Sequence, residues 1–182
     1  TAFASFVDVL RLSADTGDKS RQMRCRWSVL SSDMQPVRAS CGLLVHPDER
    51  LRDVSQFDYL VVVGGLIEHT EFLSPSYKQF LHKAAEAKVG LIGLCTGGFA
   101  LHDVGLMDGY KCCVSWFHRF DFLERFEGLE PVSDRIFVVD RNRMTCSGGS
   151  SAAHLAAFLV DRHIGKRFAQ KSLRILIVDE AF

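Results

Sequence analysis

The chain has 182 residues, of which 47% are hydrophobic and 24% are charged, and its 22 basic residues balance 22 acidic ones. This composition is typical of one folded domain with its own core, and it excludes a disordered chain. The balanced charge gives this chain no electrostatic reason to bind nucleic acid or an anionic membrane. No apolar run reaches the roughly 18 to 20 residues of a membrane span and no signal-peptide pattern is present, so we expect a soluble, cytoplasmic domain.

The first third of the chain predicts one helix followed by strands. Residues 2–12 have apolar positions at helical spacing, whereas residues 25–32 and 42–46 are strand-like. Residues 57–65 are an unbroken apolar, largely β-branched run that ends in two glycines. We expect this run to be the central strand of a parallel sheet, buried on both faces.

Helical and strand-like patterns alternate through the rest of the chain. Ser74 and Pro75 predict the start of a helix that runs to about Lys88. Residues 148–164 predict the last clear helix, after which residues 165–182 lose the helical period and are expected to lead out of the domain. Between them we expect a strand over 89–95, a helix from about Thr96, mixed helical spacing over 117–126 and a hairpin over 135–146.

Strands that alternate with helices predict an α/β fold, with a doubly wound, mostly parallel sheet and helices on both faces. Ligands of such sheets bind at the carboxyl ends of the strands. Three glycine-bearing strand ends, at 64–65, 95–97 and 146–149, are therefore expected to meet at one edge.

The segment Gly93-Leu94-Cys95-Thr96-Gly97 fits the strand-to-helix elbow that displays a nucleophile. The start of a helix favours the thiolate form of a cysteine, and the Thr96 N–H would point toward an oxyanion on a bound carbonyl. The glycine pair 64–65 is a candidate for the second N–H donor. Alternatively, these glycines only allow the helix to pack closely against the strand.

A cysteine nucleophile also needs a base. Among seven histidines, only His118 lies in a region expected to face the elbow, whereas His69 is expected in the loop after Gly65. The histidines and the six cysteines lack the spacing of a metal site or a disulfide framework. We therefore expect no metal, no cofactor, and reduced, mostly buried thiols.

Four segments together resemble a known family: VVVGG, GLCTGGFAL, GLMDGYKCCVSW and MTCSGGSSAAHLAAFLV. They resemble the flavodoxin-like, class I glutamine amidotransferase-like fold in its ThiJ/PfpI branch. More closely, nearly the whole chain resembles the amino-terminal domain of GlxA-type AraC/XylS-family transcriptional regulators. The resemblance implies that residues 1–182 are a single effector-sensing, dimerising domain. It also implies that the family's first strand would precede Thr1, and that a carboxyl-terminal helix-turn-helix domain outside this chain binds DNA.

The resemblance also carries over the catalytic positions of the ThiJ/PfpI enzymes. Cys95 matches their elbow cysteine, while Thr96 replaces the histidine that follows it in PfpI-type proteases. Ser115 stands where catalytic relatives have a histidine, and the first acid of the chain, Asp8, does not match their carboxylate. Serine is no base near neutral pH, and the loss of acid–base assistance removes about two to four orders of magnitude in rate. We therefore expect a degenerate elbow with no catalytic residues.

Without a complete catalytic triad, the residues at these strand ends and helix starts still predict a ligand pocket. Backbone donors at two helix N-termini favour an anionic group, and Trp116 offers a face to an apolar or cationic one. These features suit a small amino acid or a quaternary ammonium compound such as a betaine, although Trp116 is equally compatible with core packing. The predicted lining residues are Gly65, Leu66, Cys95, Thr96, Ser115, Trp116, Ser147, Gly148 and Gly149.

Two other functions stay open at this stage. One is a cysteine hydrolase, amidotransferase or glyoxalase-like lyase that uses Cys95 with His118 as its base. The other is a redox sensor in which Cys95 is reversibly oxidised. The resemblance also implies a homodimer, for which the amphipathic helices and residues 117–126 are candidate interfaces.

Overall fold

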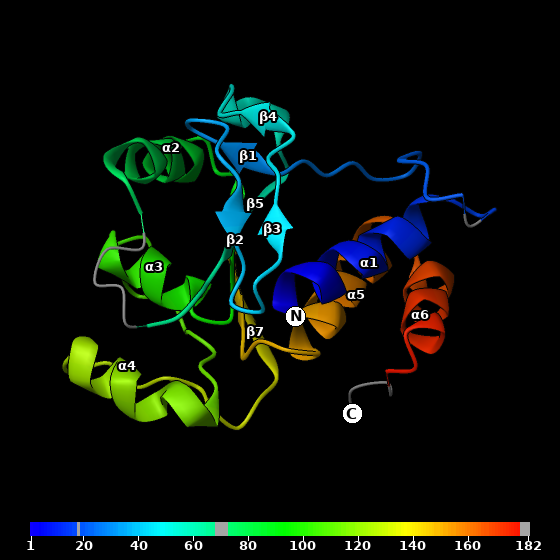
Figure 1. Ribbon diagram of the computed structural model, residues 1–182. Helices are drawn as coiled ribbons and strands as arrows, with labels where there is room; N and C mark the ends of the chain where they lie inside the picture. Colours follow the sequence, from blue (N-terminus) through cyan, green and yellow to red (C-terminus); the bar gives the residue numbers. More distant parts are fainter. Residues whose placement is uncertain (18, 68–72, 179–182) are drawn as a thin grey trace.

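The computed structural model describes residues 1–17, 19–67 and 73–178 (Figure 1). Its centre is a four-stranded sheet in the order β5-β6-β8-β7, in which β5, β6 and β8 are parallel and β7 is antiparallel to β8. These strands are β5 Tyr59–Val63, β6 Gly90–Leu94, β7 Phe137–Asp140 and β8 Arg143–Cys146.

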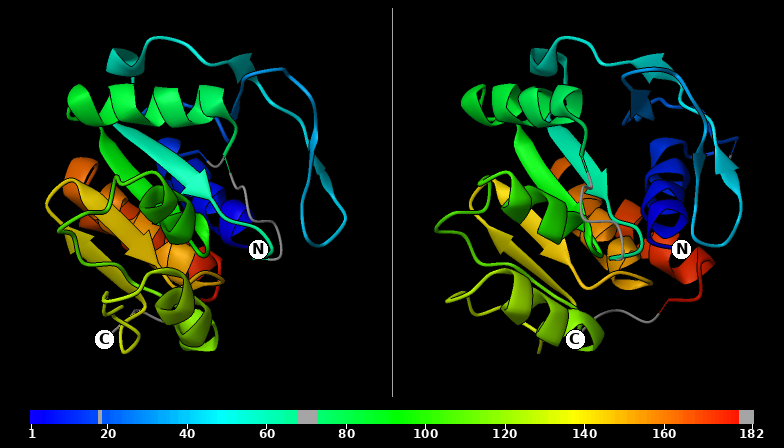
Figure 2. Two further views of the ribbon diagram at one scale, coloured as in Figure 1. Left: turned by 90° about the vertical axis from the view of Figure 1, so that its left-hand side faces the viewer. Right: turned by 60° about the vertical axis from the view of Figure 1, so that its left-hand side comes forward.

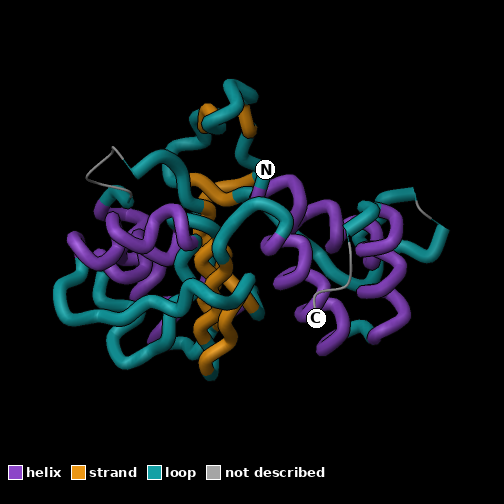
Figure 3. The backbone as a smooth tube through the Cα atoms, turned by 90° about the horizontal axis from the view of Figure 1, so that it is seen from below, coloured by secondary structure: helices purple, strands orange, loops and turns teal. Residues whose placement is uncertain are grey.

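Helices cover both faces of this sheet, as Figure 2 shows from two sides. Viewed from below in Figure 3, the strands lie between two groups of helices. The expected doubly wound α/β fold is confirmed. One group is α1 Ala2–Ala14, α5 Ser151–His163 and α6 Lys166–Ile175; the other is α2 Pro75–Glu86, α3 Gly97–Asp103 and α4 Arg119–Arg125, which follows the short turn η2 Trp116–His118.

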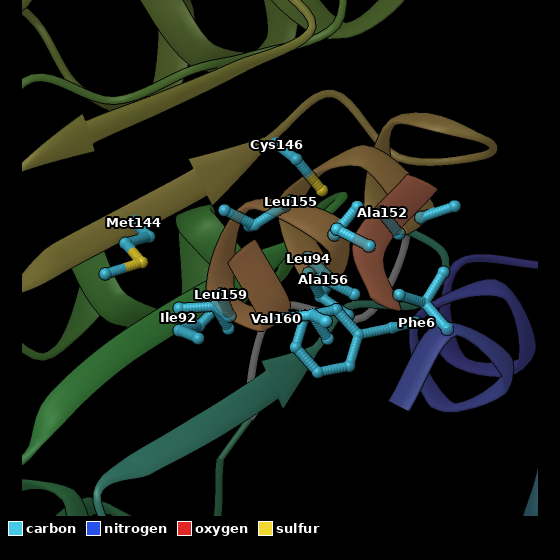
Figure 4. Packing of buried hydrophobic residues seen from close by; sticks show 14 of the residues in the cluster. Phe6, Ile92, Leu94, Met144, Cys146, Ala152, Leu155, Ala156, Leu159 and Val160 are labelled. Carbon is cyan, nitrogen blue, oxygen red and sulfur yellow. The ribbon is translucent and has the colours of Figure 1, made fainter. Parts of the chain in front are cut away.

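The central strand β6 explains why the sheet has a core on each face. All five of its residues are buried, and successive side chains point to opposite faces. Leu91 packs in the core beneath α2 and α3, whereas Ile92 and Leu94 pack in the core formed with α1, α5 and α6. Figure 4 shows Ile92 and Leu94 beside side chains of α5. Burial on both faces is the physical reason for the continuous apolar sequence of this strand.

The prediction that residues 57–65 form the central, fully buried strand is wrong. β5 spans Tyr59–Val63 and pairs on one side only among the described residues, with β6. Leu60 is buried, but Val61 and Val63 are 37% and 42% exposed. An apolar run predicts a strand in a buried sheet. It does not determine which strands pair with it, and so does not determine whether it is central or at the edge.

The two early strands are much shorter than predicted. Within 25–32 only β1 Leu30–Ser31 is a strand, and it pairs in parallel with β4 Glu49–Arg50. Within 42–46 only β3 Leu44–Val45 is a strand, and it pairs antiparallel to β2 Val37–Arg38. Both pairs are separate from the four-stranded sheet, and Figure 2 shows the β2–β3 hairpin extending from the body of the domain.

The prediction that residues 165–182 lead out of the domain is wrong for the part that the structure describes. Residues 166–175 form α6, which packs back against α1 and α5. Ala169, Ser172 and Leu173 are its buried positions, and Ser172 Oγ lies 2.7 Å from Ser13 Oγ of α1. The buried face carries two small residues and one leucine among several charged ones, so its apolar period is weak although its spacing is helical. No helix in the described ranges is long and apolar enough to span a membrane.

Candidate functional site

The predicted elbow is present at the carboxyl end of β6. Cys95 follows directly after Leu94 and has φ +56°, and Thr96 then begins α3 as its N-cap residue. A residue other than glycine in this left-handed conformation is strained by roughly 1–3 kcal/mol and is held there by its surroundings. The half-buried Cys95 side chain is thereby displayed at the edge where the predicted pocket should lie.

The elbow is held against β5 by close backbone packing. A Cβ added at Gly64 would collide with Thr96 Oγ1 and with the Gly97 nitrogen. Thr96 is buried, and its hydroxyl donates a 2.7 Å hydrogen bond to the Gly65 carbonyl. The Gly64 N–H donates to the Leu94 carbonyl, so within the predicted glycine pair the second donor would have to be Gly65. Strain at Cys95 and close packing at the glycines therefore occur together.

A cavity of about 370 Å³ lies beside the elbow, where β8 leads into α5. Gly148, in its wall, is in direct contact with Cys95: a Cβ added at Gly148 would lie 2.9 Å from Cys95 Sγ. The cavity is within the size range of small-molecule sites, toward its lower end. Its lining residues are Ser115, Trp116, Ser133, Asp134, Arg135, Ile136, Ser147 and Gly148.

Four of the nine predicted residues line this cavity: Ser115, Trp116, Ser147 and Gly148. Trp116 is 77% exposed at its rim, so the alternative that this side chain packs in the core is wrong. The other five residues lie outside the lining. Cys95 lies behind Gly148, Thr96 and Gly65 bond to each other beneath the elbow, and Leu66 and Gly149 are exposed.

Half of the residues in the cavity wall come from residues 133–136, which the sequence does not predict as part of the pocket. A parallel bridge between Cys113 and Val132, with a hydrogen bond from the Val114 N–H to the Val132 carbonyl, places this segment beside Ser115. No periodic pattern marks an irregular loop, and the bridge joins positions far apart in the chain. The only sequence signal was the polar pair Asp134 and Arg135 directly before a strand.

Ser133 lines the cavity, but its hydroxyl is buried within the protein. The Ser133 Oγ has no hydrogen-bond partner among the described residues. An unsatisfied buried hydroxyl costs about 1–3 kcal/mol of stability. Next to Ser133, Asp134 and Arg135 bring one negative and one positive side chain to the same wall.

The positions that would supply a catalytic base have other structural roles. Ser115 is the N-cap residue of η2, where its Oγ accepts a 3.1 Å hydrogen bond from the Phe117 N–H. His118 Nδ1 lies 2.9 Å from an Asp121 carboxylate oxygen, and His118 is not among the residues that line the cavity. The predicted loop position of His69 lies outside the described residues. His118 is therefore not placed as a base against the cavity.

The six cysteines are all free, but only Cys112, Cys113 and Cys146 are buried. Burial raises the pKa of the Cys112 and Cys113 thiols to about 12 and also raises that of Cys146. Such thiols are inert near neutral pH. Within the described ranges, no group of three or more His, Cys, Asp or Glu side chains could hold a metal ion.

Comparison with known proteins decides the family. The model of the DJ-1/PfpI family matches residues 13–162. The chain belongs to the DJ-1/PfpI family. The resemblance to the ThiJ/PfpI branch is therefore confirmed, and Cys95 is the elbow cysteine of a DJ-1/PfpI domain.

Several curated relatives of this DJ-1/PfpI domain are regulators. The transcriptional regulator GbdR of Pseudomonas aeruginosa is 32% identical over 169 residues, covering 92% of this chain and 44% of that protein. The regulator CdhR of the same species is 32% identical over 167 residues, covering 92% and 48%. The chain thus spans less than half the length of these relatives. An isonitrile hydratase of Pseudomonas putida is also similar, at 29% identity over 143 residues, 76% of this chain and 59% of the enzyme.

Solved structures agree with this result. A crystal structure of an AraC family transcriptional regulator from Pseudomonas putida superposes with a TM-score of 0.78 at 27% identity, over 96% of this chain and 91% of that one. The Drosophila melanogaster DJ-1beta structure superposes with a TM-score of 0.75 at 20% identity, over 98% and 91%, and shares the fold. This DJ-1/PfpI domain is thus similar to several proteins named as transcriptional regulators and to one named as an enzyme.

Proposed function

We propose that this chain is the ligand-sensing and dimerising domain of an AraC-type transcriptional regulator, and that it does not catalyse a reaction. The observation that carries the proposal is the cavity beside Cys95, whose lining among the described residues combines Asp134, Arg135 and Trp116 and includes no histidine. The Ser115 hydroxyl, also in this lining, can hydrogen-bond to a ligand but cannot take its proton near neutral pH.

The chemistry of the wall supports a small zwitterion as the ligand. The Arg135 guanidinium matches the geometry of a carboxylate, which it can bind through two hydrogen bonds. Asp134 and the exposed face of Trp116 match a cationic group, because a carboxylate and an aromatic face both attract cations. An amino acid or a quaternary ammonium compound such as a betaine carries both groups.

In this function, another part of the protein binds DNA. The charges of this chain balance, and its regulator relatives are about twice as long as the segment it matches. We propose that a carboxyl-terminal helix-turn-helix domain binds DNA and that two copies of this domain pair, since paired half-sites call for a two-fold protein. This function would place the protein in the cytoplasm.

Binding can be measured directly by calorimetry and by the thermal shift of the purified chain with a panel of amino acids, betaines and polyamines. A ligand at a hundred times its dissociation constant should add about 2.7 kcal/mol to the free energy of unfolding. Ser133→Ala should leave the ligand-free stability unchanged or raised, because it removes an unsatisfied buried hydroxyl. Arg135→Gln should weaken carboxylate ligands by about 10- to 100-fold.

Arg174→Gln is the matched control, because Arg174 is an exposed arginine on α6, outside the cavity. It should bind the ligand as the wild type does. If no compound in the panel shifts the unfolding temperature, the sensing proposal fails. If Arg135→Gln and Arg174→Gln bind equally well, the cavity is not where the ligand sits.

One observation favours a second candidate, a Cys95-dependent enzyme or redox sensor. The φ of +56° at Cys95 is a strained conformation that ligand binding by the Ser133–Arg135 wall does not require. A Cys95 enzyme would show turnover that Cys95→Ser abolishes, and a redox sensor would gain the mass of one oxygen at Cys95 under mild peroxide. A wild-type chain that shows neither result excludes this candidate.

A further inference from the structure

The charges of this chain balance in total but are unevenly distributed. Residues 162–178 include five lysines or arginines and no aspartate or glutamate, and residues 19–26 include four and none. These two basic segments hold nine of the 22 basic residues and none of the 22 acidic ones. The expectation drawn from the total charge, that nothing attracts this chain to a polyanion, therefore does not hold for this region.

The two basic segments meet at α6. The Arg24 guanidinium lies over the Phe168 ring, 4.4 Å from the ring centroid, and Arg24 is an exposed residue. The helix itself packs against α1 and α5 (Figure 1). Basic side chains from both segments therefore gather around α6.

Arg167, Lys171 and Arg174 form a row along the outer side of α6. Their spacing of four and then three residues places them on one side of a helix. This side is opposite to the buried positions of the helix, which are Ala169, Ser172 and Leu173. We refer to the row, together with Lys166, as the basic face of α6. Within residues 1–17, 19–67 and 73–178, no carboxylate forms an ion pair with Lys166, Arg167 or Arg174.

The stability of the helix does not explain Lys166 and Arg167. They are the first two residues of α6, which follows Gly165 and has no acidic residue in its first turn. The N-terminus of a helix carries a partial positive charge, so acidic side chains are favourable there and cations are not. Two cations at this end of an otherwise well-packed helix indicate a role in binding.

We propose that the basic face of α6, with Arg24 beside it, binds the phosphate backbone of double-stranded DNA without reading its sequence. Lysine and arginine are the main partners of phosphate oxygens, and a guanidinium can bind a phosphate through two hydrogen bonds. Between residues 166 and 174 a helix rises roughly 12 Å, and a DNA strand carries one charge per about 3.4 Å of its axis. The basic face can therefore reach roughly three phosphates of one strand.

DNA fits this face better than an anionic membrane does. A helix that binds a membrane surface inserts an apolar face into the lipid, whereas the apolar side of α6 is buried against α1 and α5. The choice of DNA also rests on the proposed function, in which a DNA-binding domain follows α6 in the chain. The basic face would then add affinity at phosphates beside the site that this other domain reads.

Fluorescence anisotropy of the purified chain with a labelled duplex of about 30 base pairs and arbitrary sequence tests the inference. We expect a dissociation constant on the order of 10–100 µM at about 50 mM salt, and binding about 100-fold weaker at about 200 mM, because roughly four phosphate contacts release counterions. A chain with Lys166→Gln, Arg167→Gln and Arg174→Gln together should bind at least about 10-fold more weakly, and its salt dependence should fall by about three counterions.

The matched control combines Arg38→Gln, Lys83→Gln and Lys111→Gln, which remove the same charge from exposed residues outside both basic segments. It should bind the duplex like the wild type, and circular dichroism checks that both triple variants remain folded.

A wild-type chain that does not bind the duplex at low salt overturns the inference, as do two triple variants that bind it equally well. Binding to vesicles of anionic lipid but not to the duplex overturns it too. Thermal shifts with the effector panel keep this result separate from ligand sensing, because Lys166, Arg167 and Arg174 do not line the cavity and the triple variant should respond to a ligand like the wild type.

Discussion

Gly148 lies directly against the side chain of Cys95, so the elbow and the wall of the cavity meet with no space between them. Gly148 has φ +98°, and a Cβ at this position would come within 2.9 Å of both Cys95 Cβ and Sγ. Two strand ends, those of β6 and β8, are therefore fitted to each other at this contact. Cys95, at the position of the predicted nucleophile, is covered on one side by the backbone of the cavity wall at Gly148.

This contact predicts a large cost for a single methyl group. We expect Gly148→Ala to lower the free energy of unfolding by about 2–4 kcal/mol, because it adds backbone strain and a clash with Cys95. Gly128→Ala is the matched control: Gly128 also has a positive φ, +80°, but faces open space, so only the strain of about 1–2 kcal/mol should remain. Urea unfolding measures both.

A double-mutant cycle identifies the clashing partner. In the background of Cys95→Gly, which removes the cysteine side chain, Gly148→Ala should cost about as much as Gly128→Ala. If Gly148→Ala and Gly128→Ala lower the free energy of unfolding equally in the wild-type background, the close contact between Gly148 and Cys95 does not affect stability.

Burial predicts which thiols react. Since burial raises the pKa of Cys112 and Cys113 to about 12, iodoacetamide should leave these two unmodified in the folded chain and label them only after unfolding. Exposed Cys41 should be labelled in the native state, and half-buried Cys95 at a comparable or lower rate. Mass spectrometry of peptides from native and unfolded samples measures each site. Labelling of Cys95 about a hundredfold faster than of Cys41 would instead favour the enzyme candidate.

The end of α1 predicts a pH-dependent contribution to stability. The Arg21 guanidinium, 2.7 Å from Asp15, holds the pKa of that carboxyl well below its usual range, with help from the Gly17 N–H. Because the folded-state pKa is the lower one, this contact stabilises the fold above the unfolded-state pKa of about 3.9 and is lost as the pH falls toward the folded-state value.

The free energy of unfolding of Asp15→Asn should therefore be lower than that of the wild type near neutral pH, and the difference should shrink as the solution is acidified. Urea unfolding of both chains at a series of pH values measures it. Arg21→Gln should show the same dependence, since it removes the other member of the pair. A difference that does not change with pH would mean that the ion pair is not formed in solution.

The packing of α6 predicts a strong contrast between neighbouring positions. Leu173 is 7% exposed in the core shared with α1 and α5, so Leu173→Ala should cost about 2–4 kcal/mol. Ile175, two residues later, is 47% exposed, and Ile175→Ala should cost less than about 1 kcal/mol. Chemical unfolding of the two variants checks this. Equal, small effects would show that residues 166–175 do not pack on the domain.

The site was predictable where it depends on local sequence. The elbow at Cys95 and the strand ends at Ser147 and Gly148 follow from glycines placed after apolar strands, which is a pattern within a few residues. Arg135 and Ser133 were not predictable, because they reach the cavity through a pairing between residues 113 and 132 that the sequence does not encode in any period. Trp116 lines the cavity, and only the structure shows that its side chain is exposed at the rim.

The sequence by itself determined the order of the main elements, the α/β class, the elbow and the family, because hydrophobic periods of two and 3.6 residues and glycine positions are local properties. Only the tertiary structure decided which strand is central. β5 and β6 are both apolar runs, but burial depends on strand neighbours and helix cover, and these contacts are made over long sequence distances. For the same reason the structure alone placed α6 on the domain and residues 133–136 in the cavity wall.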